Sequence, residues 1–295
     1  MTADAIDNPY TRPGPMTDAG PHTATLAAAA DVPALARMIH GVLLHQHWAG
    51  AYGQKLTAER AASAQLRRVR DLLDAAIARD PAPLNVARPP DRRVVGVCEH
   101  FSVLGVSALR ARGVPARARC GFGMYFEAGK GIDHWIAEYW NGRRWVAADF
   151  QIDQVQAAVL QPDFDVLDQP PGKFLSAGEA WQACRKGSMD PLRFGIFEEG
   201  GFWFIAQNLM RDLAALNNME MLPWDVWGAM PRPADPMTPD RLALFDRVAG
   251  LTAAAEPDAG ELRRTYENDI GLRVPDQVFN AVRQTKEPVL PADIV

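Results

Sequence analysis

The dipeptide Asn141-Gly142, set between two segments in which apolar and polar residues alternate, is the feature that most constrains this chain's fold. A type I′ turn needs positive φ at both central residues, so Asn-Gly predicts a two-residue hairpin loop. The strands would then cover Asp133–Trp140 and Arg143–Asp149. In this register Trp140 faces Arg143, and His134 lies directly opposite Asp149 on one face of the sheet.

The predicted pairing of His134 with Asp149 would suit acid–base chemistry. Directly opposed residues on neighbouring antiparallel strands have Cβ atoms about 4.5–5.5 Å apart. At that separation a carboxylate can accept a hydrogen bond from one imidazole nitrogen and leave the other nitrogen available to a thiol. The hairpin therefore predicts an oriented general base.

A candidate thiol lies upstream, in the segment Gly96–Phe101, at Cys98. Apolar residues recur at helical spacing from Ser102 to Arg112, and Gly113 and Pro115 provide a stop signal. Cys98 is thus expected close to the N-terminus of a helix, where the macrodipole favours the thiolate over the thiol. We predict that Cys98 is a nucleophile.

Three blocks of the sequence, Gly96–Phe101, Leu109–Phe122 and Asp133–Asp149, together resemble the core of the transglutaminase-like superfamily. That core has a cysteine that opens a helix, a Gly-Val-Pro-Ala-Arg passage into the first strand, a histidine strand, and an aspartate that ends the next strand. The resemblance covers about Val94 to Asp153. The sequence resembles the bacterial type. The calcium sites and extra β-domains of the large animal crosslinking enzymes have no evident counterpart, so the resemblance does not extend to protein crosslinking.

The resemblance implies a papain-like Cys-His-Asp site used for acyl transfer or amide hydrolysis. Matched position by position, Cys98 is the nucleophile, His134 the base and Asp149 the orienting acid. It implies an amide- or thioester-containing substrate, no cofactor and no metal. The acceptor, amine or water, and the oligomeric state stay open. The alternative function is a non-catalytic module that binds a peptide or ligand on the same fold.

The whole pattern predicts an α+β fold with a transglutaminase-like (papain-like) core. A central antiparallel sheet would pack on the nucleophile helix, with extra helices at both ends. We expect residues 1–24 to form a disordered lead and residues 25–295 a single domain. Within that domain, 25–90 would be helical, 91–155 the catalytic core, and 156–295 mainly helical.

Other chemistry-bearing residues have competing interpretations. Trp135, Trp203 and Trp224 are candidates for substrate contact, since aromatic side chains commonly line clefts. Cys120 is more typical of strand packing, and Cys184 has no supporting pattern.

Several polar residues are expected to be structural or solvent-facing. His100 should contact solvent or bond locally. His40, His45 and His47 lack the cysteine or carboxylate companions usual for zinc. Glu138 would need a partner such as Arg117 or Arg119, and Arg211 and Asp212 suit a solvated helix face.

Composition narrows the class of protein further. The chain has 295 residues, a net charge of −5 and three cysteines. The charge is modest, and no basic patch favours nucleic acid or a membrane surface. No apolar run reaches the roughly 18 residues needed to span a bilayer. An odd, sparse cysteine set without a secretory signal at the N-terminus favours a reduced, cytoplasmic protein.

Overall fold

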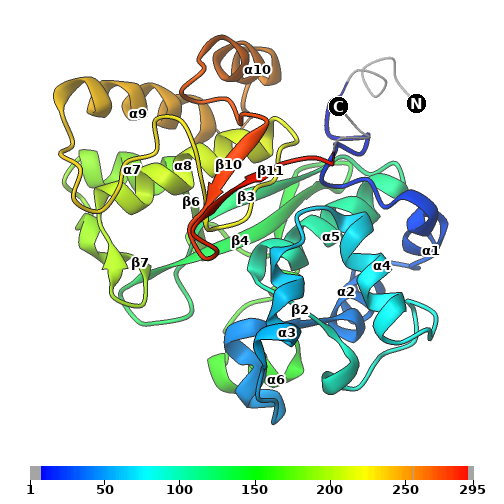
Figure 1. The fold of residues 1–295 in the computed structure, drawn as a ribbon. Coiled ribbons are helices and arrows are strands. Elements are labelled where there is room, and N and C mark those ends of the chain that lie inside the picture. The colour runs from blue at the N-terminus through cyan, green and yellow to red at the C-terminus, as the bar shows by residue number, and fades with distance from the viewer. Residues whose placement is uncertain (1–7, 255, 292–295) are drawn as a thin grey trace. The chain divides into compact units, whose positions relative to one another are not determined.

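The computed structural model describes residues 8–254 and 256–291, and within them the fold is mixed α+β, as the sequence predicts (Figure 1). These residues divide into two compact units, and the single domain expected over 25–295 stays a prediction. The first unit comprises residues 8–118 and 136–170, and the second comprises 119–135 and 171–291. The boundaries fall inside two strands, β3 (Ala116–Gly123) and β4 (Gly131–Trp140).

The first unit is built around α5 (Cys98–Ala111), which is buried from Cys98 to Arg110. A helix buried around its whole circumference must be covered by other elements. Three helices pack against it, α1 (Thr23–Ala27), α2 (Val32–Val42) and α4 (Val69–Arg79) (Figure 1). Within α2, Pro33 occupies the first turn and Asp31 caps it by accepting from the Ala34 N–H, an arrangement that helix starts favour.

The rest of the first unit consists of short elements. Its strands are β1 (Leu43–His45), β2 (Val94–Gly96) and β5 (Trp145–Ala148), and its short helices are α3 (Ala58–Ala61) and α6 (Gln154–Leu160). Turns of 3-10 helix cover Gly20–His22, Gln46–Tyr52, Ala62–Gln65 and Pro90–Arg92. The segment expected to be helical over 25–90 is therefore interrupted by a strand and by several tight turns.

Part of the lead expected to be disordered is ordered. Residues 1–7 lie outside the described residues, but Tyr10 and Met16 are buried. The Ala116 N–H donates to the Tyr10 carbonyl at 3.0 Å, and the Val69 N–H donates to the Met16 carbonyl at 2.8 Å. The segment contains several prolines and glycines, which suggested disorder. Its order comes from hydrogen bonds with residues far along the chain, which the local sequence does not reveal.

The second unit contains most of the sheet. Its strand order is β6 (Phe174–Ser176), β3, β4, β7 (Phe194–Ile196) and β8 (Glu199–Gly200). The pairs are antiparallel where the register is defined, except that β4 and β7 run parallel with Gly131 opposite Phe194. The antiparallel sheet that the sequence predicts thus carries one parallel pair.

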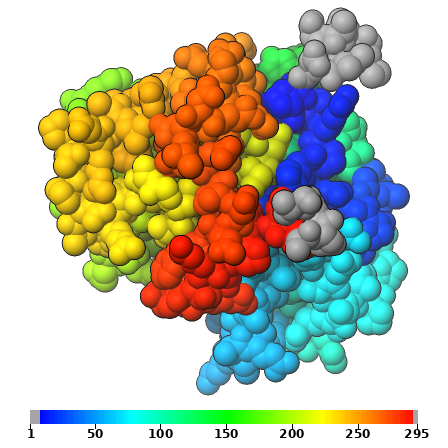
Figure 2. Space-filling view, turned by 45° about the horizontal axis from the view of Figure 1, so that its top comes forward, coloured from blue at the N-terminus to red at the C-terminus, as the bar shows by residue number. Residues whose placement is uncertain are grey.

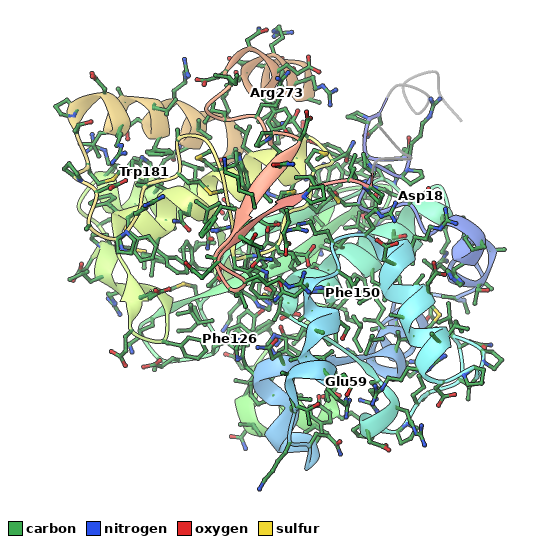
Figure 3. All side chains as sticks on the ribbon, in the orientation of Figure 1. Asp18, Glu59, Phe126, Phe150, Trp181 and Arg273 are labelled. Atoms are coloured by element: carbon green, nitrogen blue, oxygen red, sulfur yellow. The ribbon has the colours of Figure 1, made fainter. Side chains whose placement is uncertain are left out.

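Helices and a second sheet complete this unit. The helices α7 (Ala177–Arg185), α8 (Phe202–Leu216), α9 (Pro239–Thr252) and α10 (Ala259–Asn268) agree with the helical C-terminal region expected from the sequence. Trp181 of α7 donates its Nε1–H to Asp246 of α9 at 2.7 Å (Trp181 is labelled in Figure 3). The segments from α9 onward, yellow-orange to red in Figure 2, form much of the surface that faces the viewer.

Several short strands in the second unit were not expected from the sequence. Three of them form a three-stranded sheet in the order β11 (Thr285–Pro288), β10 (Gln277–Asn280) and β9 (Asp225–Val226). In the chain β9 lies between α8 and α9, and β10 and β11 follow α10. Among the residues that the structure describes, no helix is both long and apolar enough to cross a membrane.

Candidate active site

Cys98 is the first residue of α5, as the sequence predicts. The preceding strand, β2, pairs in parallel with β1, and the last pair in this ladder is His45 with Gly96. Val97 is extended and caps the helix. Cys98 is buried, with 7% of its surface exposed. The Cys98 thiol therefore lies at the N-terminus of a 14-residue helix, which is the positive end of the helix dipole.

Gly96 allows this tight entry into α5. A Cβ at Gly96 would lie 2.9 Å from the Cβ of His100, closer than such atoms approach. The His100 ring thus occupies the space beside the turn that a larger residue would need.

His100 fixes the helix start through both ring nitrogens. Nδ1 accepts from the Val97 N–H at 3.2 Å, and Nε2–H donates to the Leu66 carbonyl at 3.0 Å. Burial lowers the pKa of His100 to about 4, against the opposing effect of these two hydrogen bonds. The ring is therefore neutral near pH 7, and the expectation of local bonding is confirmed while that of solvent contact is wrong.

The first turn of α5 also fixes the Cys98 main chain. Ser102 donates its hydroxyl to the Cys98 carbonyl at 3.0 Å. The first N–H groups of a helix have no partner inside the helix. Cys98 is the first residue of α5, so its N–H lies at this end of the helix.

The hairpin register differs from the prediction by two residues. β5 begins at Trp145, and the observed pairs are Trp140 with Trp145 through Ala137 with Ala148. The loop has four residues, because Asn141 Oδ1 accepts from both the Arg143 and the Arg144 N–H at 3.0 Å. This side-chain turn competes with the type I′ turn, so His134 is not directly opposite Asp149.

Asp149 lies just beyond the last pair of the β4–β5 ladder and is fully buried. Its N–H donates to the Val166 carbonyl at 2.8 Å, and its Oδ1 accepts from the Gln151 N–H at 2.8 Å. These bonds end the strand and turn the chain toward α6. A carboxylate held in this way is restricted in orientation, as an orienting acid must be.

His134 lies in β4 within the second unit and is also buried. Two aromatic rings meet its imidazole edge-on, Phe126 with centroids 4.8 Å apart and Tyr125 at 6.0 Å (Phe126 is labelled in Figure 3). The preceding residue, Asp133, accepts from Asn208 Nδ2 of α8 at 2.7 Å. Burial raises the pKa of Asp133, and the charge of Arg211 opposes that rise.

The three predicted catalytic residues therefore come from both units. Cys98 and Asp149 belong to the first, and His134 belongs to the second. Their assembly into one triad stays a prediction.

The three tryptophans predicted to contact substrate all belong to the second unit. Trp135 is fully buried, and its Nε1–H has no hydrogen-bond partner in the described structure. A substrate could reach that ring only if its neighbours moved. Trp203 and Trp224 are partly exposed, and Trp203 packs edge-on against Phe204 with ring centroids 5.3 Å apart.

Sequence reasoning missed a group of polar residues around Asp149. His40 of α2 donates from Nε2 to the Phe150 carbonyl at 2.9 Å. Gln151 donates to Gln156 Oε1 at 2.9 Å, and Gln156 donates to the Tyr52 hydroxyl at 3.3 Å. These residues are widely separated in sequence, and no short motif marks them. Among the described residues, no three His, Cys, Asp or Glu side chains are grouped as metal ligands would be.

Comparison with known families matches residues 46–150 to the Transglutaminase-like superfamily. The resemblance predicted from the sequence is thereby confirmed, and the matched segment contains Cys98, His134 and Asp149. It starts well before Val94, so the helices and turns between residue 46 and β2, including α3 and α4, lie in the matched segment, although no family pattern was recognised there.

No curated protein matches the chain. A solved structure from Cytophaga hutchinsonii, described as "a putative cysteine protease", is similar with a TM-score of 0.32 and 16% sequence identity. The similarity covers 51% of this chain and 43% of that chain, so this chain spans less than half of the length of that protein.

Proposed function

We propose that this chain is a cysteine-dependent acyltransferase or amide hydrolase that acts through a thioester acyl-enzyme on Cys98. The observation that carries the proposal is the position of Cys98 as the first residue of α5, inside the segment matched to the transglutaminase-like core. A thiol there has its anionic form stabilised by the helix dipole, by about 0.3–1 kcal/mol at exposed sites and more where partly buried. We assign proton transfer to His134 and the orientation of its imidazole to Asp149.

The first half of the proposed reaction forms the thioester. The His134 imidazole takes the thiol proton, and the Cys98 sulfur attacks the carbonyl carbon of an amide or a thioester. The carbonyl oxygen becomes an oxyanion, and the Cys98 N–H is suited to stabilise it, since a helix start presents N–H groups outward. When the intermediate collapses, the protonated His134 gives its proton to the departing amine or thiol.

The second half releases the acyl group. Water or an amine attacks the thioester carbonyl while His134 takes the proton from that nucleophile. The Cys98 sulfur then leaves as thiolate and takes that proton from His134, which returns the enzyme to its starting state. Hydrolysis and transfer differ only in which nucleophile enters, so one site supports both.

The corrected hairpin register is compatible with this assignment. Side chains alternate between the two faces of a strand, so a shift of two residues keeps the same residues on each face. Continued past Ala137, the observed pairing would put Asp149 opposite Ile136, which shares its parity with His134. Ile136 and His134 are two residues apart on β4, so their side chains leave the strand on one face, which supports the assignment.

Intact-mass spectrometry with a generic acyl donor tests the proposal. Protein mixed with p-nitrophenyl acetate should gain one acetyl group, on Cys98, and the adduct should be removed by neutral hydroxylamine as a thioester is. Cys98→Ala should lose the adduct and turnover. Its thermal unfolding midpoint should stay near the wild-type value, because the substitution changes the side-chain volume only slightly.

Cys184→Ala provides the matched control, because Cys184 has the same 7% exposure as Cys98. It should form the adduct as fast as wild type. A wild-type protein that forms no adduct, together with binding of a peptide or small ligand, would favour the non-catalytic binding module. Persistence of turnover in Cys98→Ala would contradict the proposed nucleophile.

A further inference from the structure

We propose that His40 is a positioning residue that holds the segment Asp149–Gln151 through the main chain at Phe150. The inference rests on the proposed function, because it assigns His40 to the orientation of Asp149. It concerns residues of the first unit alone.

The contact joins two elements that are far apart in sequence. His40 lies in the last turn of α2, and its Nε2 is 2.9 Å from the Phe150 carbonyl oxygen, 110 residues away. A carbonyl oxygen only accepts, so Nε2 must carry the proton and donate. The carbonyl belongs to the peptide between Phe150 and Gln151, and the N–H of that same peptide donates to Asp149 Oδ1, so His40 holds the peptide that holds the carboxylate.

The Phe150 side chain is fixed from the other side by α5. A Cβ at Gly105 would lie 2.4 Å from Phe150 Cδ2, so the ring rests directly on the helix backbone at that glycine. Phe150 is fully buried (its place is labelled in Figure 3). The nucleophile helix therefore holds the ring of Phe150, and His40 holds its main chain.

Two further bonds complete the restraint on Asp149. Its Oδ1 accepts from the Gln151 N–H, and the Gln151 side chain is bonded in turn to Gln156. Both glutamines are buried. Rotation of the Phe150 peptide would move the Gln151 N–H and so turn the carboxylate.

His40 is neutral in this position at and above pH 7. Burial lowers its pKa, while the charges of Asp153 and Asp149 and the hydrogen bond to Phe150 raise it, and Arg93 lowers it. Because burial is the largest of these effects, His40 acts as a neutral hydrogen-bond donor. Its one N–H is used by the Phe150 carbonyl.

The test is the pH dependence of Cys98 alkylation by iodoacetamide, measured by peptide mass spectrometry in wild type and three variants. His40→Leu removes the donor, and His40→Gln places an amide N–H near the position of Nε2. His22→Leu is the matched control, because His22 belongs to the same unit and bonds instead to Asp74 at 2.7 Å. Thermal unfolding midpoints are recorded for all four proteins.

We expect the pH midpoint of Cys98 alkylation in wild type to lie well below the pKa of a free thiol, which is near 8.5. In His40→Leu the rate at pH 6.5 should fall about tenfold, because small displacements of positioned groups cost rate steeply, and the curve should move toward higher pH. His40→Gln should recover most of the rate, and His22→Leu should match wild type. A purely structural role would lower the unfolding midpoint without moving the curve along the pH axis.

Three outcomes overturn the inference. A wild-type protein whose Cys98 alkylates only near pH 8.5 removes the proposed function and the role of His40 with it. An early wild-type curve that His40→Leu leaves in place removes the role of His40 and leaves the proposed function standing. A shift shared by His40→Leu and His40→Gln also removes it, because the N–H donor would then not be the property that matters.

Discussion

At the scale of single residues, the partners of buried charged groups were only partly predictable from the sequence. Arg117 pairs with Glu138 at 2.6 Å, as one of two expected partners. Asp212, expected on a solvated face, is instead fully buried and holds Arg119 in a two-pronged bond with distances of 3.0 and 2.9 Å. The expectation was wrong because the α8 sequence shows charges but not the arginine, 93 residues away, that neutralises one of them.

His100 makes a testable contribution to stability at this scale. Its pKa is about 4 in the folded protein, against 6.5 for a histidine exposed to water, as in the unfolded chain. Below pH 6.5 the unfolded chain binds a proton at this residue and the folded chain does not until about pH 4. The contribution is therefore complete above pH 6.5 and is lost as pH falls through this window, by about 3 kcal/mol in all.

Urea unfolding of wild type and His100→Gln at pH 7, 5.5 and 4.5 measures this effect. Wild-type stability should fall more steeply between pH 7 and 4.5 than that of His100→Gln, which cannot take up the proton. Equal pH slopes in the two proteins would show that His100 does not titrate between these states.

At the scale of elements, long periodic segments were predictable and turn geometry was not. The helical spacing after Cys98 matches α5 closely, and α8 lies in the region expected to be mainly helical. The hairpin was predicted, but its loop was not, since one side chain, Asn141, accepts two main-chain N–H groups and lengthens it to four residues. The strands β6 to β11 have between two and four residues, too few for alternation to be recognised.

Two helix glycines give a matched test of element packing. Ala at Gly105 would place a Cβ 2.4 Å from the buried Phe150 ring, whereas at Gly250 of α9 nothing lies within 4 Å. Gly105→Ala should therefore destabilise by about 1–3 kcal/mol through overpacking. Gly250→Ala should stabilise by about 0.5–1 kcal/mol, because alanine loses less entropy in a helix.

Denaturant midpoints of both glycine variants, measured beside wild type, provide the comparison. Stabilisation by both substitutions would mean that helix propensity outweighs the contact with Phe150. That result would also weaken the argument that α5 holds the segment after β5.

At the scale of the whole molecule, the sequence predicts the α+β class and the family core but not the division into two units. The unit boundaries cut β3 after Ala118 and β4 after Trp135. A linker rich in proline, glycine or polar residues is the usual sign of a boundary, and neither strand has that composition. The ordered segment from residue 8 to 24 was missed for a related reason, since its partners are distant in sequence.

The chain carries its own control for the central claim that Cys98 is an activated nucleophile. Cys98 and Cys184 are equally exposed, at 7%, but Cys98 begins α5 while Cys184 is in the last turn of α7. Helix dipoles act in opposite directions at these two ends. Burial and the charge of Asp190 raise the pKa of Cys184 to about 11.

The most direct measurement is the ratio of iodoacetamide alkylation rates at Cys98 and Cys184 in the wild-type protein at pH 6.5, read from the two peptides in one digest. Because only the thiolate reacts, the ratio compares the anionic fractions of two equally exposed cysteines. We expect Cys98 to react at least about a hundredfold faster than Cys184. Equal, slow alkylation of the two cysteines would contradict it.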